Sequence, residues 1–415
     1  MQNYRYIPEI LGVGEPKTYL ILALDNTRLT PIGGDISAFA QITMSNGSIQ
    51  EITVKSIDDV TLTTSSLDTL TLDEINNRRY SLKDSGTIKS TDLATIGNYD
   101  KFSNTIATLW QESFGAEIDG VMTMNLNAFE DFIESSESED LAIVGGIEFS
   151  DKNALLANIK AAQSGNANLV SKRSVIAQLF AALLNQSFDF LTDKNSEILL
   201  DLNSSAKNQN MAVSIPEQDI KDYIEQSDLN MQKLYDSESY VSVGINVEDP
   251  KIVSFDRYPS VNLALKTLIT EEYQLNNELT VVFPNYGTTQ EVSVCLPSNT
   301  LLNTISVDAA TIPEQRVTVN STEDEVCVVA QVLAETQLNL TWSVESYFAA
   351  DATDVDLNLA VAKVRGSNTT IDYSVSTEAG VEIKGVNLPI SFDKNKLVFS
   401  QSIFSDLGLE LKLSK

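Results

Sequence analysis

The chain has 415 residues, enough for two or three domains, and its 58 acidic and 28 basic residues give a formal net charge of −30. Because nucleic acids and anionic lipids are bound largely through Lys and Arg, this balance argues against both as partners. The chain contains no histidine, which excludes the Ser-His-Asp triad, the Cys-His pair and the usual zinc ligands. Any catalysis would depend on carboxylates, Arg, Lys, Tyr or a metal bound through oxygen atoms.

The first predicted elements are three strands. Residues 19–24 form a short apolar run with polar residues on both sides, which is typical of a buried central strand. Residues 36–44 and 49–57 are predicted as two further strands, and the Asn46-Gly47 pair between them is a strong hairpin signal.

The loop between the first two strands carries charged side chains to the end of the sheet. In open α/β sheets ligands usually bind where loops follow strand ends, which makes Asp25 and Asp35 candidate catalytic acids and Arg28 a candidate anion ligand. The favoured reading of this loop is structural, and an anion site is the alternative. In the structural reading Arg28 is buried in an ion pair with Asp25 or Asp119, and the loop is a corner of the domain.

The remaining residues of this loop favour a tight turn whether or not a ligand binds. Gly33 and Gly34 allow backbone conformations that other residues avoid, and Pro31 stiffens the approach to them. Asn26 can hydrogen-bond to its own turn.

Residues 61–104 are polar and include Arg78-Arg79, which form either a solvated face or an anion clamp over the Arg28 loop. A helix is predicted over residues 105–114. Asp119 begins a predicted strand at 119–125, where it either pairs with backbone amides or serves as a third candidate acid. A helix over residues 126–133 follows.

The next segment is mainly helical. After a short strand at 143–149 and a helix at 152–162, residues 170–191 form the best predicted helix, with apolar residues at i, i+3, i+4 and i+7. Arg173 lies near its start as a surface ion-pair residue or a further anion ligand. Two more helices are predicted, at residues 197–207 and 217–226.

From about residue 240 the pattern changes to short strands every eight to twelve residues, which is typical of β-sandwich packing. Cys295 and Cys327 can pair only with each other, as a disulfide, or remain two buried thiols. The cluster Asp351, Asp354 and Asp356 is a calcium candidate, although it lacks the Gly and terminal Glu of an EF-hand loop.

The opening segment resembles a family of bacterial extracytoplasmic proteins of unknown function, with an N-x-R-x-x-P-x-G-G signature and an Asn-Gly hairpin. The matching residues are Asn26, Arg28, Pro31, Gly33, Gly34 and Asn46-Gly47. The chain departs from the family at Thr27, where an acidic residue is usual, and at Asp35, where an aromatic residue is usual.

More remotely, the layout is similar to the LytR-CpsA-Psr (LCP) proteins, which transfer glycopolymers from polyprenyl pyrophosphate to the cell wall. That resemblance implies an arginine-containing helix that binds pyrophosphate, here at Arg173, and an acid that binds magnesium. The LCP motif Ser-Ile-Pro-Arg-Asp corresponds to residues 56–59, Ser-Ile-Asp-Asp, in which the arginine is absent.

Members of the resembling family usually carry an N-terminal membrane helix, and the present N-terminus has no signal-peptide pattern. We therefore expect the ectodomain of a membrane-anchored protein, located outside the cytoplasm at the cell surface or in the cell envelope. Any membrane contact is expected through a segment absent from this chain.

Together these observations predict an α+β or α/β chain. An LCP-like layered α/β domain is expected at residues 1–235, followed by β-rich segments at 236–345 and 346–415. The favoured function is a non-catalytic envelope protein that binds or scaffolds glycopolymer or other surface proteins. The alternatives are an LCP-like phosphotransferase and an adhesin or surface-lattice subunit. No cofactor is firmly indicated, although Mg²⁺ or Ca²⁺ is compatible with the carboxylates.

Overall fold

The computed structural model describes residues 6–62, 67, 71, 75, 90–135, 143–144, 147–148, 157, 169–190, 204–226, 239–246, 260–283, 290–307, 317–321, 325–332, 337–345, 348, 352–403 and 407–415. The contacts divide the chain into two units. The first holds the described residues 6–62, 67, 71 and 90–226, and the second holds residue 75 and the described residues from 239 onward. The fold is mixed α/β, as the sequence predicts.

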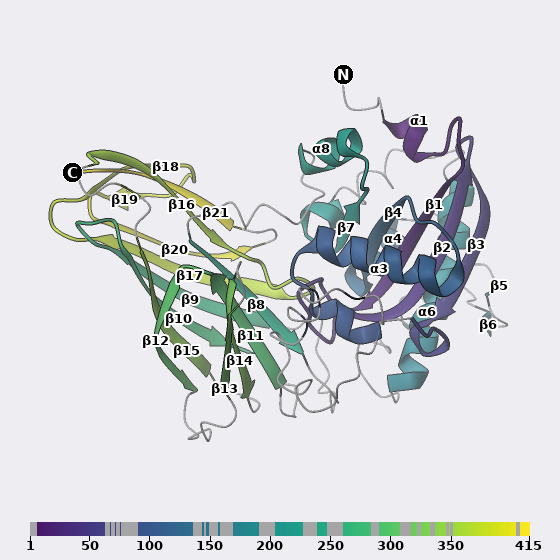
Figure 1. The fold of residues 1–415 in the computed structure, drawn as a ribbon, viewed down its shortest axis with the longest axis horizontal. Coiled ribbons are helices and arrows are strands. Elements are labelled where there is room, and N and C mark those ends of the chain that lie inside the picture. The colour runs from purple at the N-terminus through teal and green to yellow at the C-terminus, as the bar shows by residue number, and fades with distance from the viewer. Residues whose placement is uncertain are drawn as a thin grey trace. The chain divides into compact units, whose positions relative to one another are not determined.

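A five-stranded sheet forms the centre of the first unit, in the order β3-β2-β1-β4-β7 (Figure 1). Its strands are β1 (Lys17–Asp25), β2 (Asp35–Ser45), β3 (Ser48–Ser56), β4 (Gly120–Asn125) and β7 (Met211–Ser214). Strand β1 pairs antiparallel with β2 and parallel with β4. Every residue from Leu20 to Leu24 is apolar, so side chains on both faces of this strand are buried.

Helices cover both faces of this sheet. Helix α3 (Tyr99–Phe114) packs on one face, where Trp110 contacts Phe39 and donates a hydrogen bond to Gln41 at 3.0 Å. Helices α4 (Leu126–Ser135) and α6 (Leu169–Phe190) pack on the other face. The remaining short elements are α1 (Ile7–Ile10), two 3₁₀ turns (Ile57–Asp59 and Ser90–Thr95), the β5/β6 pair (Ile143–Val144 and Ile147–Glu148) and α8 (Gln218–Gln226).

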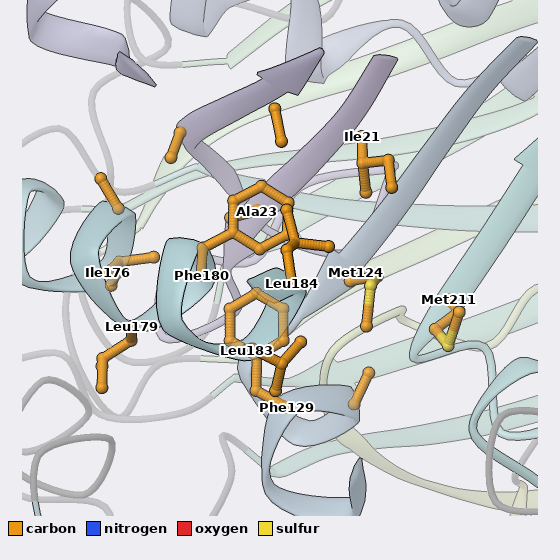
Figure 2. Close-up of a cluster of buried hydrophobic side chains, with 14 of the residues drawn as sticks. Ile21, Ala23, Met124, Phe129, Ile176, Leu179, Phe180, Leu183, Leu184 and Met211 are labelled. Carbon is orange, nitrogen blue, oxygen red and sulfur yellow. The ribbon is translucent and has the colours of Figure 1, made fainter. Parts of the chain in front are cut away.

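The apolar core on the α6 face shows why residues 169–190 form a helix here. Ile176, Leu179, Phe180 and Leu183 recur at helical spacing and lie against β1 and β2, as Figure 2 shows for this helix. Phe180 stacks on Phe129 of α4 with ring centroids 5.5 Å apart.

The structure differs from the prediction at three elements of this unit. The single strand predicted at residues 143–149 is two short paired strands, β5 and β6. Helix α3 begins at Tyr99, six residues before the predicted start, because Asn98 accepts a hydrogen bond from the amide of Lys101 and caps the helix. Strand β7 was not predicted, since four residues are too few for a periodic signal. All of the predicted helix at residues 152–162 except residue 157, which is helical, and most of the one at 197–207 lie outside the described residues.

The second unit is a β-sandwich of two seven-stranded sheets, ordered β12-β15-β10-β9-β17-β20-β19 and β13-β14-β11-β8-β16-β21-β18 (Figure 1). The strand bounds are β8 (Ser239–Asn246), β9 (Ser260–Ile269), β10 (Leu275–Val282), β11 (Gln290–Pro297), β12 (Thr300–Val307), β13 (Val317–Ser321), β14 (Glu325–Val332), β15 (Gln337–Val344), β16 (Asp354–Val361), β17 (Asn368–Thr377), β18 (Glu382–Val386), β19 (Phe392–Asp393), β20 (Lys396–Ile403) and β21 (Leu407–Ser414). Strands β9, β12, β19 and β21 were not predicted.

The segments at 236–345 and 346–415 share both sheets of this sandwich. Strand β16 pairs in parallel with β8, and β17 pairs in parallel with β9. The predicted boundary at residue 345 therefore does not separate two folding units. Sequence periodicity shows where strands occur but not which strands pair across such a boundary.

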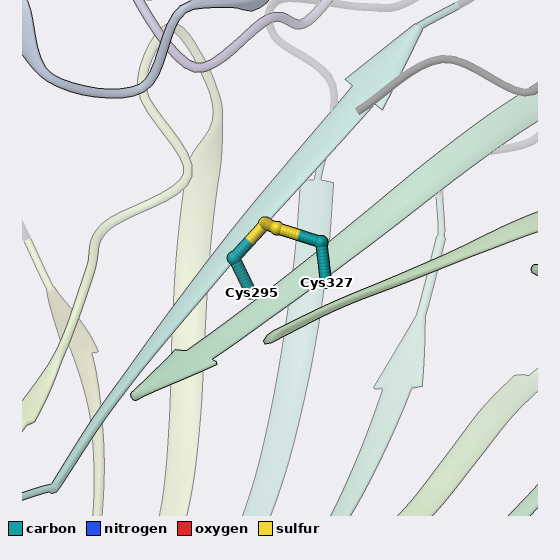
Figure 3. Close-up of a disulfide and its surroundings, with 2 residues drawn as sticks. All are labelled: Cys295 and Cys327. Carbon is teal, nitrogen blue, oxygen red and sulfur yellow. A yellow bond between two sulfur atoms is a disulfide. The ribbon is translucent and has the colours of Figure 1, made fainter. Parts of the chain in front are cut away.

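Cys295 and Cys327 face each other across β11 and β14 and form a disulfide with an S–S distance of 2.08 Å (Figure 3). Both cysteines are fully buried. Among the helices of the described residues, none is long and apolar enough to cross a membrane.

Candidate functional site

The polar residues of the first unit gather at one edge of its sheet. Parallel strands β1 and β4 end there, β2 begins there, and β3 ends there. The first turn of α6 reaches the same edge. We call the six charged residues that meet at this edge the strand-end cluster: Asp25, Arg28, Asp35, Asp58, Lys172 and Arg173.

The buried part of the cluster is an ion pair between Lys172 and Asp25. Lys172 Nζ lies 2.7 Å from Asp25 Oδ2, and the two residues are 2% and 1% exposed. Lys172 also donates a hydrogen bond to Thr27 Oγ1, and Thr27 in turn donates to Asp25 Oδ1 at 2.6 Å. Burial alone would raise the pKa of Asp25, but the charge of Lys172 and the hydrogen bonds from Lys172 and Thr27 hold that pKa below its ordinary value.

A chain of ion pairs continues from this buried pair toward the surface. Asp35 accepts hydrogen bonds from both Arg28 and Arg173, the latter at 3.1 Å, and Arg173 also donates to Asp58 at 3.0 Å. Burial lowers the pKa of Arg173, but Asp35 and Asp58 raise it, and the net change is an increase. Arg28 is therefore buried in an ion pair, with Asp35 rather than with Asp25 or Asp119.

These pairs also explain how two cations, the fourth and fifth residues of α6, can lie near the N-terminal end of the helix. The N-terminal end of a helix carries partial positive charge, so Lys172 and Arg173 are unfavourable there without acidic partners. The strand ends supply those partners in Asp25, Asp35 and Asp58. The cluster consequently fixes the start of α6 on the sheet edge.

The loop between β1 and β2 is held by its backbone. Gly33 has φ +103°, a conformation that favours glycine, and a Cβ on Gly34 would lie 2.8 Å from the carbonyl carbon of Asp25. Thr30 donates a hydrogen bond to the carbonyl oxygen of Gly34 at 2.8 Å and accepts one from the Gly34 amide at 3.1 Å. The segment from Thr30 through Pro31 to the two glycines therefore forms a tight corner.

Beside the cluster, a set of amides joins this corner to β4. Asn26 donates a hydrogen bond to Asn127, and Asn127 donates to Asn210 at 3.3 Å. Asn125 caps α4 by accepting hydrogen bonds from the amides of Asn127 and Ala128 at 3.0 and 3.2 Å. The amide set is neutral and internally bonded.

Sequence reasoning missed Lys172 and Asp58 as members of the cluster. The signal for Lys172 was present, because it lies four residues before Ile176 and eight before Phe180, on the buried stripe of the helix. Asp58 lies beyond the end of β3, next to Asp59, and the sequence did not show which cation would pair with these carboxylates.

The other candidates lie away from this edge. Asp119 is at the opposite end of β1 and β4, where it accepts a hydrogen bond from the amide of Thr18 at 2.7 Å and pairs with Lys17 at 3.1 Å. Arg78, Arg79 and Asp351 lie outside the described residues. Asp354 and Asp356 are exposed on β16.

Metal binding finds little support in these geometries. In the part of the chain that the structure describes, the only group of three close ligand-type residues is Cys295, Glu325 and Cys327, whose two sulfur atoms are already bonded to each other. In the strand-end cluster, the two oxygens of Asp25 bind Lys172 and Thr27. Asp25 therefore offers no free carboxylate oxygen to Mg²⁺, which binds through carboxylate oxygens and retained water.

The cluster as a whole has three carboxylates and three cations, so its formal charge is zero. An incoming phosphate would have to compete with Asp35 for both arginines. The arrangement is suited to locking the loop, the strand ends and α6 together.

Comparison with known proteins gives one family match. Residues 14–155 match the family model DUF4012, described as a protein of unknown function. The match contains the β1–β2 corner and β4, and it confirms the expected resemblance to a family of unknown function. No curated protein matches the chain.

Several solved structures are similar to part of this chain. Protein gbs0355 from Streptococcus agalactiae is 11% identical, with a TM-score of 0.32 over 55% of this chain and 78% of its own. Lin1025 from Listeria innocua is 12% identical, with a TM-score of 0.29 over 52% and 79%. TagV from B. subtilis is 14% identical, with a TM-score of 0.29 over 51% and 79%.

Proposed function

We propose that this chain is a non-catalytic protein of the bacterial cell envelope, which binds or scaffolds envelope glycopolymer or other surface proteins outside the cytoplasm. The observation that carries the proposal is the internal neutralisation of the strand-end cluster. The two described arginines that would hold a pyrophosphate are already bound to Asp35, and Arg173 also binds Asp58. A site built to receive a polyanion would present uncompensated cations.

Two further observations support the location. The disulfide between Cys295 and Cys327 is typical of proteins outside the reducing cytoplasm. The strong negative charge favours a soluble, well-hydrated surface and disfavours attachment to anionic lipid.

A phosphotransferase is the second candidate, because Arg28 and Arg173 do meet one acid at the carboxyl ends of strands. In that case Asp35 would hold the arginines in place until a pyrophosphate displaced it. The two functions differ in what removal of the Asp35 charge should do.

The test compares the wild type with Asp35→Asn in three measurements: binding to purified cell-wall sacculi, binding of polyprenyl pyrophosphate, and transfer of glycan from it. We expect the wild type to bind sacculi without transfer, and Asp35→Asn to lose thermal stability without gaining pyrophosphate binding. Asp119→Asn is the matched control, since Asp119 lies at the opposite end of the sheet. Glycan transfer by the wild type, or a gain of pyrophosphate binding in Asp35→Asn alone, would favour the transferase.

A further inference from the structure

Strand β12 is an edge strand of the β-sandwich. It is the first strand of its sheet and pairs with β15 alone among the described strands, which leaves the backbone groups of its other side facing outward. The strand is eight residues long. Its Leu301 is 64% exposed, the highest value among the large apolar side chains of the described residues. An edge of this length and exposure is a template for pairing with another strand.

The two edge strands at this end of the sandwich carry no charge. Strand β13, the edge of the other sheet, lies at the same end as β12 (Figure 1), and neither strand contains Asp, Glu, Lys or Arg. Residues 292–307, which include β12, form the longest stretch of the chain without a charged residue. Strands at the opposite end carry Glu382, Lys384, Asp393 and Lys396. Charged side chains commonly protect edges against pairing, and β12 lacks this protection.

The net charge of the chain indicates which partner suits this edge. With a formal charge of −30, two copies of the chain repel each other. At the β12 and β13 edges two copies can approach without opposing like charges, and each offers the other an uncharged strand. A second copy of this chain therefore fits the edge, whereas a charged partner would gain no electrostatic attraction there.

Strand β12 is also matched to itself in an antiparallel arrangement. The bulge between Leu302 and Thr304 shifts the alternation of side chains by one residue. Half-buried and exposed positions consequently follow the same order in both directions from the Asn303–Thr304 peptide bond. A two-fold axis at this bond places the half-buried Leu302 opposite the half-buried Ile305 of the partner subunit. It likewise places the exposed Asn303 opposite the exposed Thr304 of the partner subunit.

We propose that this chain forms a symmetric homodimer in which β12 of one copy pairs antiparallel with β12 of another, so that two sheets join into one. The contact supplies hydrogen-bonding partners along the outward side of β12 and brings Leu301 beside Ser306 of the partner subunit. It is closed, because a two-fold contact uses the same surface on both subunits. The inference does not rest on the proposed function, since it requires neither a glycopolymer nor an envelope location.

The experiment measures the molar mass of the full chain by analytical ultracentrifugation between about 1 µM and 1 mM, where we expect the wild type to change from monomer to dimer. Thr304 is the residue to change, because it is exposed and its two copies lie beside the axis, within reach of long side chains. Thr304→Lys and Thr304→Glu should each raise the dimer dissociation constant at least about tenfold, since each brings like charges together.

An equimolar mixture of Thr304→Lys and Thr304→Glu is the decisive measurement. Opposite charges then meet at the axis, so the mixture should dimerise more strongly than either variant alone. Recovery in the mixture also shows that both variants fold without the 2.6 Å hydrogen bond between the hydroxyl groups of Thr304 and Thr341. Should either variant fail to fold, Asn303→Lys and Asn303→Glu flank the same axis and take their place.

Val398→Lys is the matched control. Val398 is 55% exposed on β20, toward the opposite end of the same sheet. The variant therefore adds the same charge to the same sheet away from β12, and its dimer dissociation constant should equal that of the wild type.

A wild type that stays monomeric up to about 1 mM would overturn the inference, as would a dimer that Thr304→Lys does not weaken. A mixture that dimerises no better than its components would contradict the pairing about Thr304. Weakening of the dimer by Val398→Lys would place the contact at the opposite end of the sheet and overturn the inference too. Assemblies that grow beyond a dimer would contradict a closed two-fold contact.

Discussion

Replacing Lys172 with Met tests whether the strand-end cluster is a structural lock. The substitution keeps most of the buried side-chain volume but leaves the Asp25 carboxylate 1% exposed and without its cation. Removing one partner of a buried ion pair typically costs about 3–5 kcal/mol, because the other charge stays desolvated. For a domain of this size, at about 2–4 °C per kcal/mol, the melting temperature of the first unit should fall by on the order of 10 °C.

The contribution of Asp25 to the free energy of unfolding should depend on pH in opposite directions in the wild type and in Lys172→Met. In the wild type the pKa of Asp25 is lowered, so its contribution to stability is present above the unfolded pKa, near 3.9, and is lost as the pH falls through the folded value. In Lys172→Met the burial of Asp25 acts without the cation and raises its pKa. The variant should therefore lose stability as the pH rises. The difference in free energy of unfolding between the variant and the wild type should become smaller below about pH 4.

Urea denaturation between pH 3 and pH 8 measures both effects, followed by the fluorescence of Trp110 in α3 with Trp342 of β15 replaced by Phe in every variant. The double variant Asp25→Asn/Lys172→Met should recover part of the lost free energy, because the buried charge is then absent. A loss below about 1 kcal/mol for Lys172→Met, the size expected of an exposed pair, would refute the assignment of this pair as buried and structural. If the difference in free energy of unfolding between the wild type and Lys172→Met did not depend on pH, the role given to the Asp25 charge would be refuted.

Three further variants test separate features. Arg28→Ala should lower the melting temperature without changing binding of polyprenyl pyrophosphate; unchanged stability with lost binding would instead support the transferase. Gly34→Ala should destabilise the corner by more than about 1 kcal/mol in urea denaturation, since its Cβ would lie 2.8 Å from the Asp25 carbonyl carbon, whereas a neutral result would mean that the loop can shift. Cys295→Ser/Cys327→Ser should lower stability by about 3–4 kcal/mol, and alkylation of the unfolded wild type without reductant should label no thiol; labelling of two would exclude the bridge.

The sequence predicted the centre of the first unit well because that part of the chain obeys local rules. The apolar run at residues 20–24 can only be buried on both faces, and the Asn46-Gly47 turn sets the hairpin of β2 and β3. Helix α6 was predicted over nearly its full length because its apolar stripe is long and regular.

The candidate site was predictable only in part, since it depends on residues far apart in the chain. The loop composition indicated a tight corner at Arg28, and the strand-end rule indicated the edge of the sheet at which Asp25, Arg28 and Asp35 lie. The partner of Arg28 could not be deduced, because Asp25, Asp35 and Asp119 were equivalent as carboxylates in sequence. The parallel pairing of β1 with β4 distinguishes Asp119 from the other two, because it places Asp119 at the opposite end of these strands from Asp25.

The pairing of β8 with β16 and of β9 with β17 has a consequence for how the chain folds as it is synthesised. Until residues 354–377 have emerged, β8 and β9 present unpaired backbone groups along one side of both sheets. Exposed edges of this kind recruit other strands, so the interval before residues 354–377 have been synthesised is the period of greatest risk for misassembly. The exposed edges are covered only when β8 pairs with β16 and β9 pairs with β17. Both pairings join segments distant in sequence and form slowly, because long loops must close first.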